Sequence, residues 1–212
     1  ELTALSTPGR DVVSVNGTGS SVILNITAVN ALDPLRNLHF VPEDAETTYA
    51  SQVFAPKFLA KTRAYSLLRF MDWGATNGSP LTTWAERPRP DEVRWSTARG
   101  VPVEVMVDLA NRVDADAWFC MPHLADDNYV VQFATYVRDH LDPGRKVYIE
   151  HSNEVWNFSF LQGVYAQQRG LSLNLSSNPF EAQLRYHSLR SVQIFQLFTT
   201  VFGGNGRLVR VL

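Results

Sequence analysis

Apolar positions along most of the chain follow two spacings in turn, one typical of buried strands and one typical of amphipathic helices. Short apolar runs predict strands at Leu35–Val41, Ser66–Met71, Ala117–Met121, Val147–His151 and Arg207–Leu212. Apolar residues three and four positions apart predict helices at Ala55–Arg63, Val101–Val113, Tyr129–Leu141, Phe160–Arg169 and Phe180–Phe202. Strands that alternate with helices in this way indicate βα units and a parallel sheet.

The helix expected at Tyr129–Leu141 has the clearest boundaries. Asp126 or Asp127 is placed to cap its N-terminus, and Pro143-Gly144 follows its end. A side-chain oxygen at the start and a Pro-Gly pair after the end are common signals of helix termini.

The beginning of the chain has a different pattern. Two β-branched, partly alternating runs, Asp11–Val15 and Ser21–Val29, flank the turn-forming residues Gly17–Ser20 and predict a hairpin. We expect residues 1–32 to be a β-strand segment. It is either the edge of an upstream β-domain or a hairpin on the floor of the following domain, with a boundary near Asn30–Pro34.

Residues 33–212 contain four predicted strand-to-helix units and a fifth strand, about half of an eight-fold barrel. An open half-barrel would leave strand edges unpaired, which a parallel sheet does not tolerate well. We therefore expect fold class α/β, with this chain forming the N-terminal half of a (β/α)8 TIM barrel. The remaining strands would come from sequence outside this chain, which we favour, or from another chain.

Composition and charge exclude several classes of protein. Hydrophobic residues are 45% and charged residues 19% of the chain, as in globular domains. The net charge of -2 offers no basic surface for nucleic acid, and no apolar stretch reaches the roughly 20 residues of a membrane span. Gly203–Gly206 lacks the Lys-Ser/Thr of a phosphate loop, and His123 with Asp126 and Asp127 lacks a metal-binding spacing, so no cofactor or metal is expected.

Five sequons for N-glycosylation point to a secreted, extracellular glycoprotein, although a surface rich in Ser, Thr and Asn would also produce such matches. They begin at Asn16, Asn25, Asn77, Asn157 and Asn174. The single cysteine, Cys120, excludes a disulfide within the chain, and its place in a predicted strand favours a buried free thiol.

Residues suited to chemistry follow the predicted strands, where barrel enzymes place their active sites. They are Arg69 late in the second predicted strand and Asp72 and Trp73 after it, His123 after the third, and Asn153, Glu154 and Trp156 after the fourth. A barrel with a purely structural role would usually have turn residues at these positions.

These residues resemble the active site of the clan A superfamily of glycoside hydrolases. That clan has an Asn-Glu pair after its fourth strand, which Asn153-Glu154 matches by strand count, and Arg69 and His123 match the Arg and His of its cellulase-like members. More narrowly, residues 25–157 resemble poorly characterised bacterial and algal proteins labelled cellulose-binding. The matching runs are Asp33–Asn37, Leu68–Trp73 and Ile149–Asn157.

The resemblance implies a mechanism with two carboxylates, about 5–5.5 Å apart in retaining enzymes. Glu154 would be the general acid/base, Asn153 would bind the sugar 2-hydroxyl, and Arg69 would keep the nucleophile ionised. The clan's nucleophile lies on the seventh strand, beyond this chain. Glu150 is not assumed to replace it, because its strand position favours a structural pair with an Arg.

Each candidate residue has a structural alternative. Glu154 could be an ordinary surface carboxylate, His123 a hydrogen-bonded rim residue, and Asp72 a loop cap rather than a substrate ligand. Trp73 and Trp156, with Trp84, could stack against sugar rings, although at least one of these three is expected in the core.

Two functions remain open from the sequence. The first is a retaining glycoside hydrolase that cleaves a β-linked polysaccharide or oligosaccharide. The second is a catalytically inactive extracellular glycoprotein that binds carbohydrate or builds a matrix on the same barrel. The Asn-Glu pair favours the first function and the sequons favour the second.

Overall fold

The computed structural model describes residues 9–14, 25–36 and 38–212. The chain divides into two compact units, residues 1–51 and 52–212, each of which is described by itself. Among the described residues, no helix has the length and apolar character of a membrane span.

The described part of the first unit has little regular structure. A single 3-10 turn, η1, covers Glu43–Ala45, and Arg10 forms an ion pair with Glu46. The predicted strand at Leu35–Val41 is wrong, because its described residues form no strand and its apolar side chains at Leu35, Leu38 and Phe40 are exposed. An apolar run forms a strand only where another surface covers it.

The predicted hairpin lies only partly within the described residues. Residues 25–29 do not form the expected strand, whereas residues 15–24, with the turn at Gly17–Ser20, lie outside the described residues. The boundary expected at Asn30–Pro34 falls inside the first unit.

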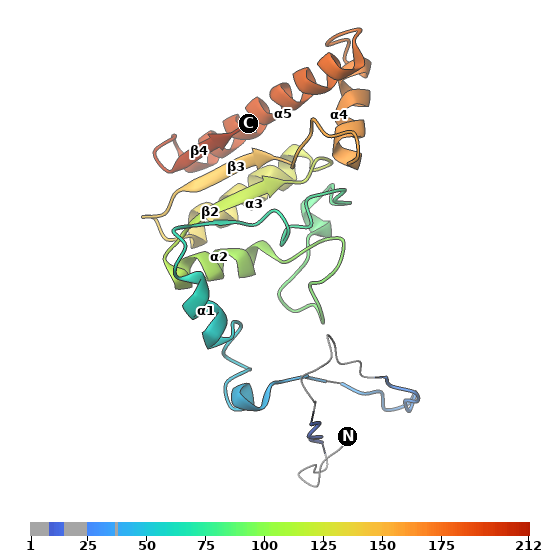
Figure 1. Ribbon diagram of the computed structural model, residues 1–212, viewed down its shortest axis with the longest axis vertical. Helices are drawn as coiled ribbons and strands as arrows, with labels where there is room; N and C mark the ends of the chain where they lie inside the picture. Colours follow the sequence, from blue (N-terminus) through green and yellow to red (C-terminus); the bar gives the residue numbers. More distant parts are fainter. Residues whose placement is uncertain (1–8, 15–24, 37) are drawn as a thin grey trace. The chain divides into compact units, whose positions relative to one another are not determined.

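The second unit is an α/β structure with one parallel sheet in the order β1-β2-β3-β4 (Figure 1). The strands are β1 (Leu67–Arg69), β2 (Asp116–Met121), β3 (Val147–His151) and β4 (Leu208–Val211). The helices are α1 (Pro56–Thr62), α2 (Val103–Val113), α3 (Asp127–His140), α4 (Leu161–Ser172) and α5 (Pro179–Phe202), with a 3-10 turn η2 at Trp84–Glu86. The sequence therefore predicted all five helices and all four strands of this unit.

Capping explains where the longer helices begin and end. The Asp126 side chain accepts a hydrogen bond from the backbone N–H of Tyr129 at 2.6 Å, which confirms the cap expected for α3. The Asn178 side chain caps α5 in the same way, and α5 ends at Gly203 in the left-handed conformation.

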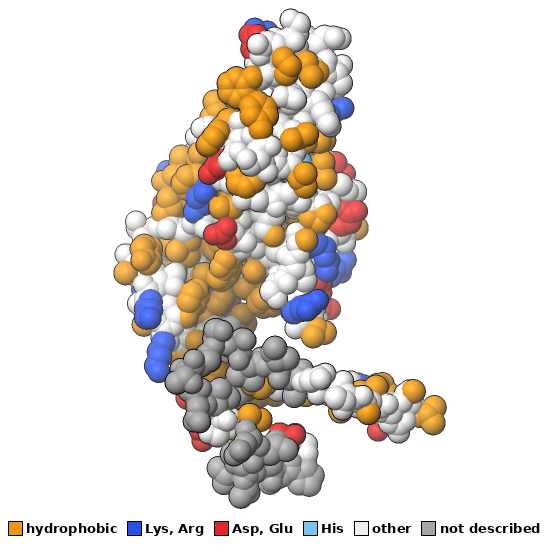
Figure 2. Space-filling model, turned by 45° about the vertical axis from the view of Figure 1, so that its right-hand side comes forward, with side chains coloured by type: hydrophobic (Ala, Val, Ile, Leu, Met, Phe, Trp, Pro, Cys, Tyr) orange, Lys and Arg blue, Asp and Glu red, His pale blue; other side chains and the backbone are white. Residues whose placement is uncertain are grey.

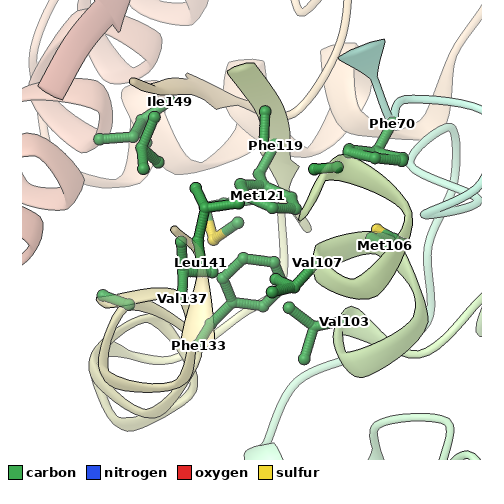
Figure 3. Packing of buried hydrophobic residues seen from close by; sticks show 14 of the residues in the cluster. Phe70, Val103, Met106, Val107, Phe119, Met121, Phe133, Val137, Leu141 and Ile149 are labelled. Atoms are coloured by element: carbon green, nitrogen blue, oxygen red, sulfur yellow. The ribbon is translucent and has the colours of Figure 1, made fainter. Parts of the chain in front are cut away.

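Helices α2, α3 and α5 pack against one face of the sheet. Phe119, Met121 and Ile149 of the sheet point toward Phe133 and Val137 of α3 (Figure 3). Val107 of α2 and Phe198 of α5 belong to the same buried cluster, so one core joins the three helices to the strands.

The opposite face of the sheet carries polar and aromatic side chains. Arg69 of β1 is in register with Trp118 of β2, and Trp118 with Tyr148 of β3. The two rings stack with their centroids 6.0 Å apart. Glu150 lies on the same face, two residues after Tyr148.

The strand count differs from the expectation by one. Because no strand forms at Leu35–Val41, Asn153 and Glu154 follow the third strand of the described sheet, not the fourth. The sheet is open among the described residues, since β1 and β4 each pair with one neighbour. The structure therefore establishes a four-stranded parallel α/β unit.

Candidate functional site

The carboxyl ends of β1 and β3 bring Arg69 and Asn153 together. Arg69 is the last residue of β1, and Asn153 follows β3 by two residues. One guanidinium nitrogen of Arg69, Nη2, donates hydrogen bonds to Asn153 Oδ1 at 2.9 Å and to Glu150 Oε2 at 2.8 Å. The sequence prediction that these strand ends converge is confirmed for this pair.

Glu150 accepts hydrogen bonds from three side chains of the two neighbouring strands, β1 and β2, through a single oxygen. Its Oε2 accepts from Arg69, from Trp118 Nε1 at 2.9 Å and from Cys120 Sγ at 3.2 Å. The Arg69 guanidinium also lies 4.7 Å from the centroid of the Trp118 ring. The expected structural pair of Glu150 with an Arg is thereby confirmed.

This cluster shifts the pKa of two of its members. Burial lowers the pKa of Arg69, but hydrogen bonding and charge from Glu150 and Cys120 raise it overall. Burial raises the pKa of the Cys120 thiol well above its usual range, and the Glu150 carboxylate raises it further. Cys120 is a buried free cysteine, as predicted.

Asn153 is fixed by a second set of hydrogen bonds on its other side. Asn153 Nδ2 donates to Asn77 Oδ1 at 2.9 Å, and Gln162 Nε2 donates to the same oxygen at 2.7 Å. Gln162 Nε2 also donates to the Asn153 carbonyl at 2.8 Å, and Gln162 Oε1 accepts from the Gly78 N–H at 3.0 Å. Asn153 and Gln162 are both buried, so a fully bonded polar network holds the segment after β3.

The turn that contains Asn153 has unusual backbone angles. Ser152 and Glu154 have φ values of 61° and 42°, a left-handed region that non-glycine residues seldom occupy. Glu154 is exposed, and its Oε2 accepts a hydrogen bond from Asn157 Nδ2 at 3.1 Å. The next residue, Val155, is buried, and its carbonyl accepts a hydrogen bond from Gln183. The turn is thus anchored on both sides of an exposed carboxylate.

The other predicted site residues are distributed over different surroundings. Trp156 is 58% exposed, two residues after Glu154. Trp73 is half-buried against the core and stacks on Phe58 at 6.2 Å, so its position favours the core alternative. Asp72 is exposed in the loop after β1.

His123 does not join the Arg69–Asn153 cluster. Its side chain is buried, and its ring meets Tyr165 of α4 edge-on at a centroid distance of 5.3 Å. Burial lowers the pKa of His123. His123 lines a pocket that also involves residues of α4 and α5.

The predicted glycosylation residues also differ in their surroundings. Asn25 and Asn174 are exposed, whereas Asn16 lies outside the described residues. Asn77 is exposed but uses its side-chain oxygen in the network with Asn153. Asn157 is half-buried, and its Nδ2, the atom to which a glycan would be attached, donates to Glu154.

A metal site finds no support in the residues that the structure describes, where no group of three His, Cys, Asp or Glu side chains could hold an ion. Asp126 caps α3, and Asp127 forms an ion pair with Arg190 at 2.6 Å. Each of these carboxylates therefore has a structural partner.

Sequence reasoning missed Asn77 and Gln162 as members of the site. Asn77 stood out only as a sequon, and Gln162 lies in a helix whose amphipathic pattern gives no reason to single it out. The burial of Gln162 is known only from the structure, so the sequence offered no signal for this residue. Comparisons of this chain with protein-family models, with curated proteins and with solved structures found no match.

Proposed function

We propose that this protein is a secreted, carbohydrate-active protein that resembles retaining glycoside hydrolases and binds a β-linked polysaccharide at the carboxyl ends of its strands. Glu154 would protonate the glycosidic oxygen, Asn153 would contact the sugar, and Trp156 would stack on a neighbouring ring. The observation that carries this proposal is the anchored turn, in which a buried, hydrogen-bonded Asn153 precedes an exposed Glu154.

The sheet supports the proposal that the complete fold is a (β/α)8 barrel. Its parallel strands follow one another in chain order, and α2, α3 and α5 cover the same face. Successive βα units wound in one direction are the arrangement that closes into a barrel, whereas doubly wound sheets carry helices on both faces.

Exposed apolar side chains on α4 and α5 also support a larger assembly. Leu161, Val164, Phe180, Leu184 and Val192 are all exposed, and apolar side chains gather over the upper part of the molecule in Figure 2. Further barrel units, from additional sequence or from another chain, would cover such a surface and pair with the open edge of β4.

Arg69 has a different role in this proposal from the one that the resemblance implied. Its Nη2 is shared by Glu150 and Asn153, so Arg69 orients the Asn153 amide. An oriented amide can distinguish a sugar hydroxyl by donating or accepting a hydrogen bond. Arg69 is therefore a positioning residue for the proposed site.

A second candidate function is supported by the contact between Glu154 and Asn157. Asn157 begins a sequon, and a glycan on its Nδ2 would lie directly beside the Glu154 carboxylate. A glycan there would crowd the proposed cleft and favour a non-catalytic carbohydrate-binding or matrix glycoprotein. Occupancy of this sequon, measured by mass spectrometry of the secreted protein, separates the two candidates.

The test of the proposed activity is hydrolysis of β-glucans, xylans and mannans by the protein and by Glu154→Gln. Loss of a general acid should lower the rate by about 10²- to 10⁴-fold while substrate binding persists. Asp139→Asn is the matched control, because it removes an exposed carboxylate in the last turn of α3 that is not part of the proposed site. Absence of turnover by the unmodified protein, or equal turnover by Glu154→Gln, would refute the hydrolase proposal.

A further inference from the structure

A pocket of about 430 Å³ lies between the segment after β2 and helices α4 and α5. This volume is within the usual range for small-ligand sites, roughly 300–1,000 Å³. The lining residues that bear on ligand chemistry are His123, Tyr165, Arg169, Tyr186, Leu189 and Arg190. Neither Asn153 nor Glu154 lines it, so the pocket is distinct from the proposed hydrolytic site.

The imidazole ring of His123 forms part of the wall of this pocket. Its side chain is 6% exposed, and Nδ1 has no hydrogen-bond partner among the described residues. Buried polar atoms in native proteins are nearly always paired. Because the protein encloses Nδ1, the imidazole contributes its ring to the pocket wall and not this nitrogen.

The two arginines of the pocket differ in how far their charge is neutralised. Arg190 donates to Asp127 at 2.6 Å and to the Ala125 carbonyl at 3.0 Å. Arg169 is exposed and forms no ion pair with a carboxylate of the described chain. The pocket therefore has one positive charge that remains unpaired.

The only carboxylate on the pocket wall is already engaged. Asp126 accepts a hydrogen bond from the backbone N–H of Tyr129, in the first turn of α3, at 2.6 Å, where the helix dipole partly balances its charge. A single unpaired guanidinium suits a ligand with one negative charge, because a doubly charged anion would require further donors.

The remaining walls are aromatic and apolar. Tyr165 and Tyr186 meet edge-on with a centroid distance of 6.0 Å, and Leu173 and Leu189 lie beside them. Both leucines are partly exposed. An aromatic face and aliphatic side chains would cover the flat apolar part of a ring-shaped ligand.

We propose that this pocket binds a small organic monocarboxylate with a ring-shaped body. The carboxylate accepts hydrogen bonds from Arg169, and the ring of the ligand lies against Tyr165 and the imidazole of His123. Two sources have this chemistry, a sugar acid and an aromatic acid. The proposal does not rest on the proposed hydrolase function, since it uses neither Asn153 nor Glu154.

Calorimetric titration with two matched ligand pairs tests the proposal. Glucuronate is paired with glucose and benzoate with benzyl alcohol, so that each pair differs in its carboxylate. We expect at least one acid to bind at least ten-fold more tightly than its neutral partner. The acid that binds better identifies the source, and inorganic phosphate is expected to bind more weakly than either.

Two variants locate the binding. Arg169→Gln should weaken binding of the acid by about ten- to one-hundred-fold, the usual effect of losing a hydrogen bond to a charged group. Arg63→Gln, which removes an exposed charge at the end of α1, should leave it unchanged. His123→Phe keeps an aromatic ring beside Tyr165, so it should leave the preference for the acid over its neutral partner unchanged.

Several results would overturn the proposal. They are equal affinity for acid and neutral ligand, phosphate binding as tight as that of the acids, or full affinity in Arg169→Gln. Circular dichroism of each variant shows whether the fold persists, so that lost binding is not mistaken for unfolding. Glu154→Gln should bind the acid normally, so a failure of the hydrolase proposal would leave this one standing.

Discussion

Replacement of Gln162 by Leu tests whether the polar network holds the segment after β3. Gln162 is fully buried and makes three hydrogen bonds, to Asn77, to the Asn153 carbonyl and from the Gly78 N–H. A net contribution of about 1 kcal/mol for each bond gives about 3 kcal/mol. Unpaired polar groups left behind increase this loss and the added apolar burial reduces it, so the expected loss in the free energy of unfolding is about 2–4 kcal/mol.

The assay is urea denaturation followed by tryptophan fluorescence. All five tryptophans lie in the unit that covers residues 52–212, so the signal reports on that unit. With a slope of about 2 kcal/mol per molar urea, the midpoint should fall by roughly 1–2 M.

Gln168→Leu is the matched control for this measurement. Gln168 lies on the same helix, α4, but is exposed, and Gln and Leu have similar helix propensities. We expect this control to change the free energy of unfolding by less than about 0.5 kcal/mol. Equal stabilities of the two variants would refute the reasoning that the network contributes to the fold.

Three further predictions concern other parts of the second unit. Burial lowers the pKa of His151 and His187 below 6.5, so the unfolded chain binds more protons. The free energy of unfolding should therefore fall as the pH drops below about 6.5, by up to about 1.4 kcal/mol per pH unit for each His. Urea titrations at several pH values measure this dependence, and His187→Gln should make the free energy of unfolding depend less steeply on pH. Gly170→Ala should lower the free energy of unfolding, measured by thermal denaturation, by about 1–3 kcal/mol or more, because the added methyl group would overlap the α5 backbone. Gly206→Ala is the control, because its added methyl group meets open space and should leave the free energy of unfolding unchanged. Cys120 should react with iodoacetamide at least about 100-fold more slowly in the folded protein than in urea, as measured by mass spectrometry, because burial raises its pKa and limits access.

The elements of the second unit could be predicted because their local signals and their burial agree. Val147–His151 was predicted with the bounds that the structure has, and helix α2 begins two residues later than expected because Pro102 is its N-cap. The strand expected at Leu35–Val41 has the same kind of apolar run, but its side chains are exposed. Periodicity indicates which residues can be buried, whereas a covering surface decides whether they are.

The candidate site could be predicted only where chain order determines neighbours. Parallel strands have their carboxyl ends on the same side of the sheet, and this rule predicted that Arg69 and Asn153 lie close together. The contacts of Asn77 with Asn153 and Gln162 join residues 76 and 85 positions apart. No local pattern specifies such a pair, because it depends on how the loop after β1 meets α4.

His123 lies outside the alternation of side chains in β2. Within the strand, Phe119 and Met121 point into the core beneath the helices, whereas Trp118 lies on the opposite face with Arg69. Strand β2 ends at Met121, and His123 lies in the turn that follows, where its ring meets Tyr165 of α4. Strand-end reasoning correctly predicts that His123 and Asn153 lie beyond the carboxyl ends of the strands. The path of each turn, and not strand parity, determines which side chains these two residues meet, and it explains why these strand ends carry two different candidate sites.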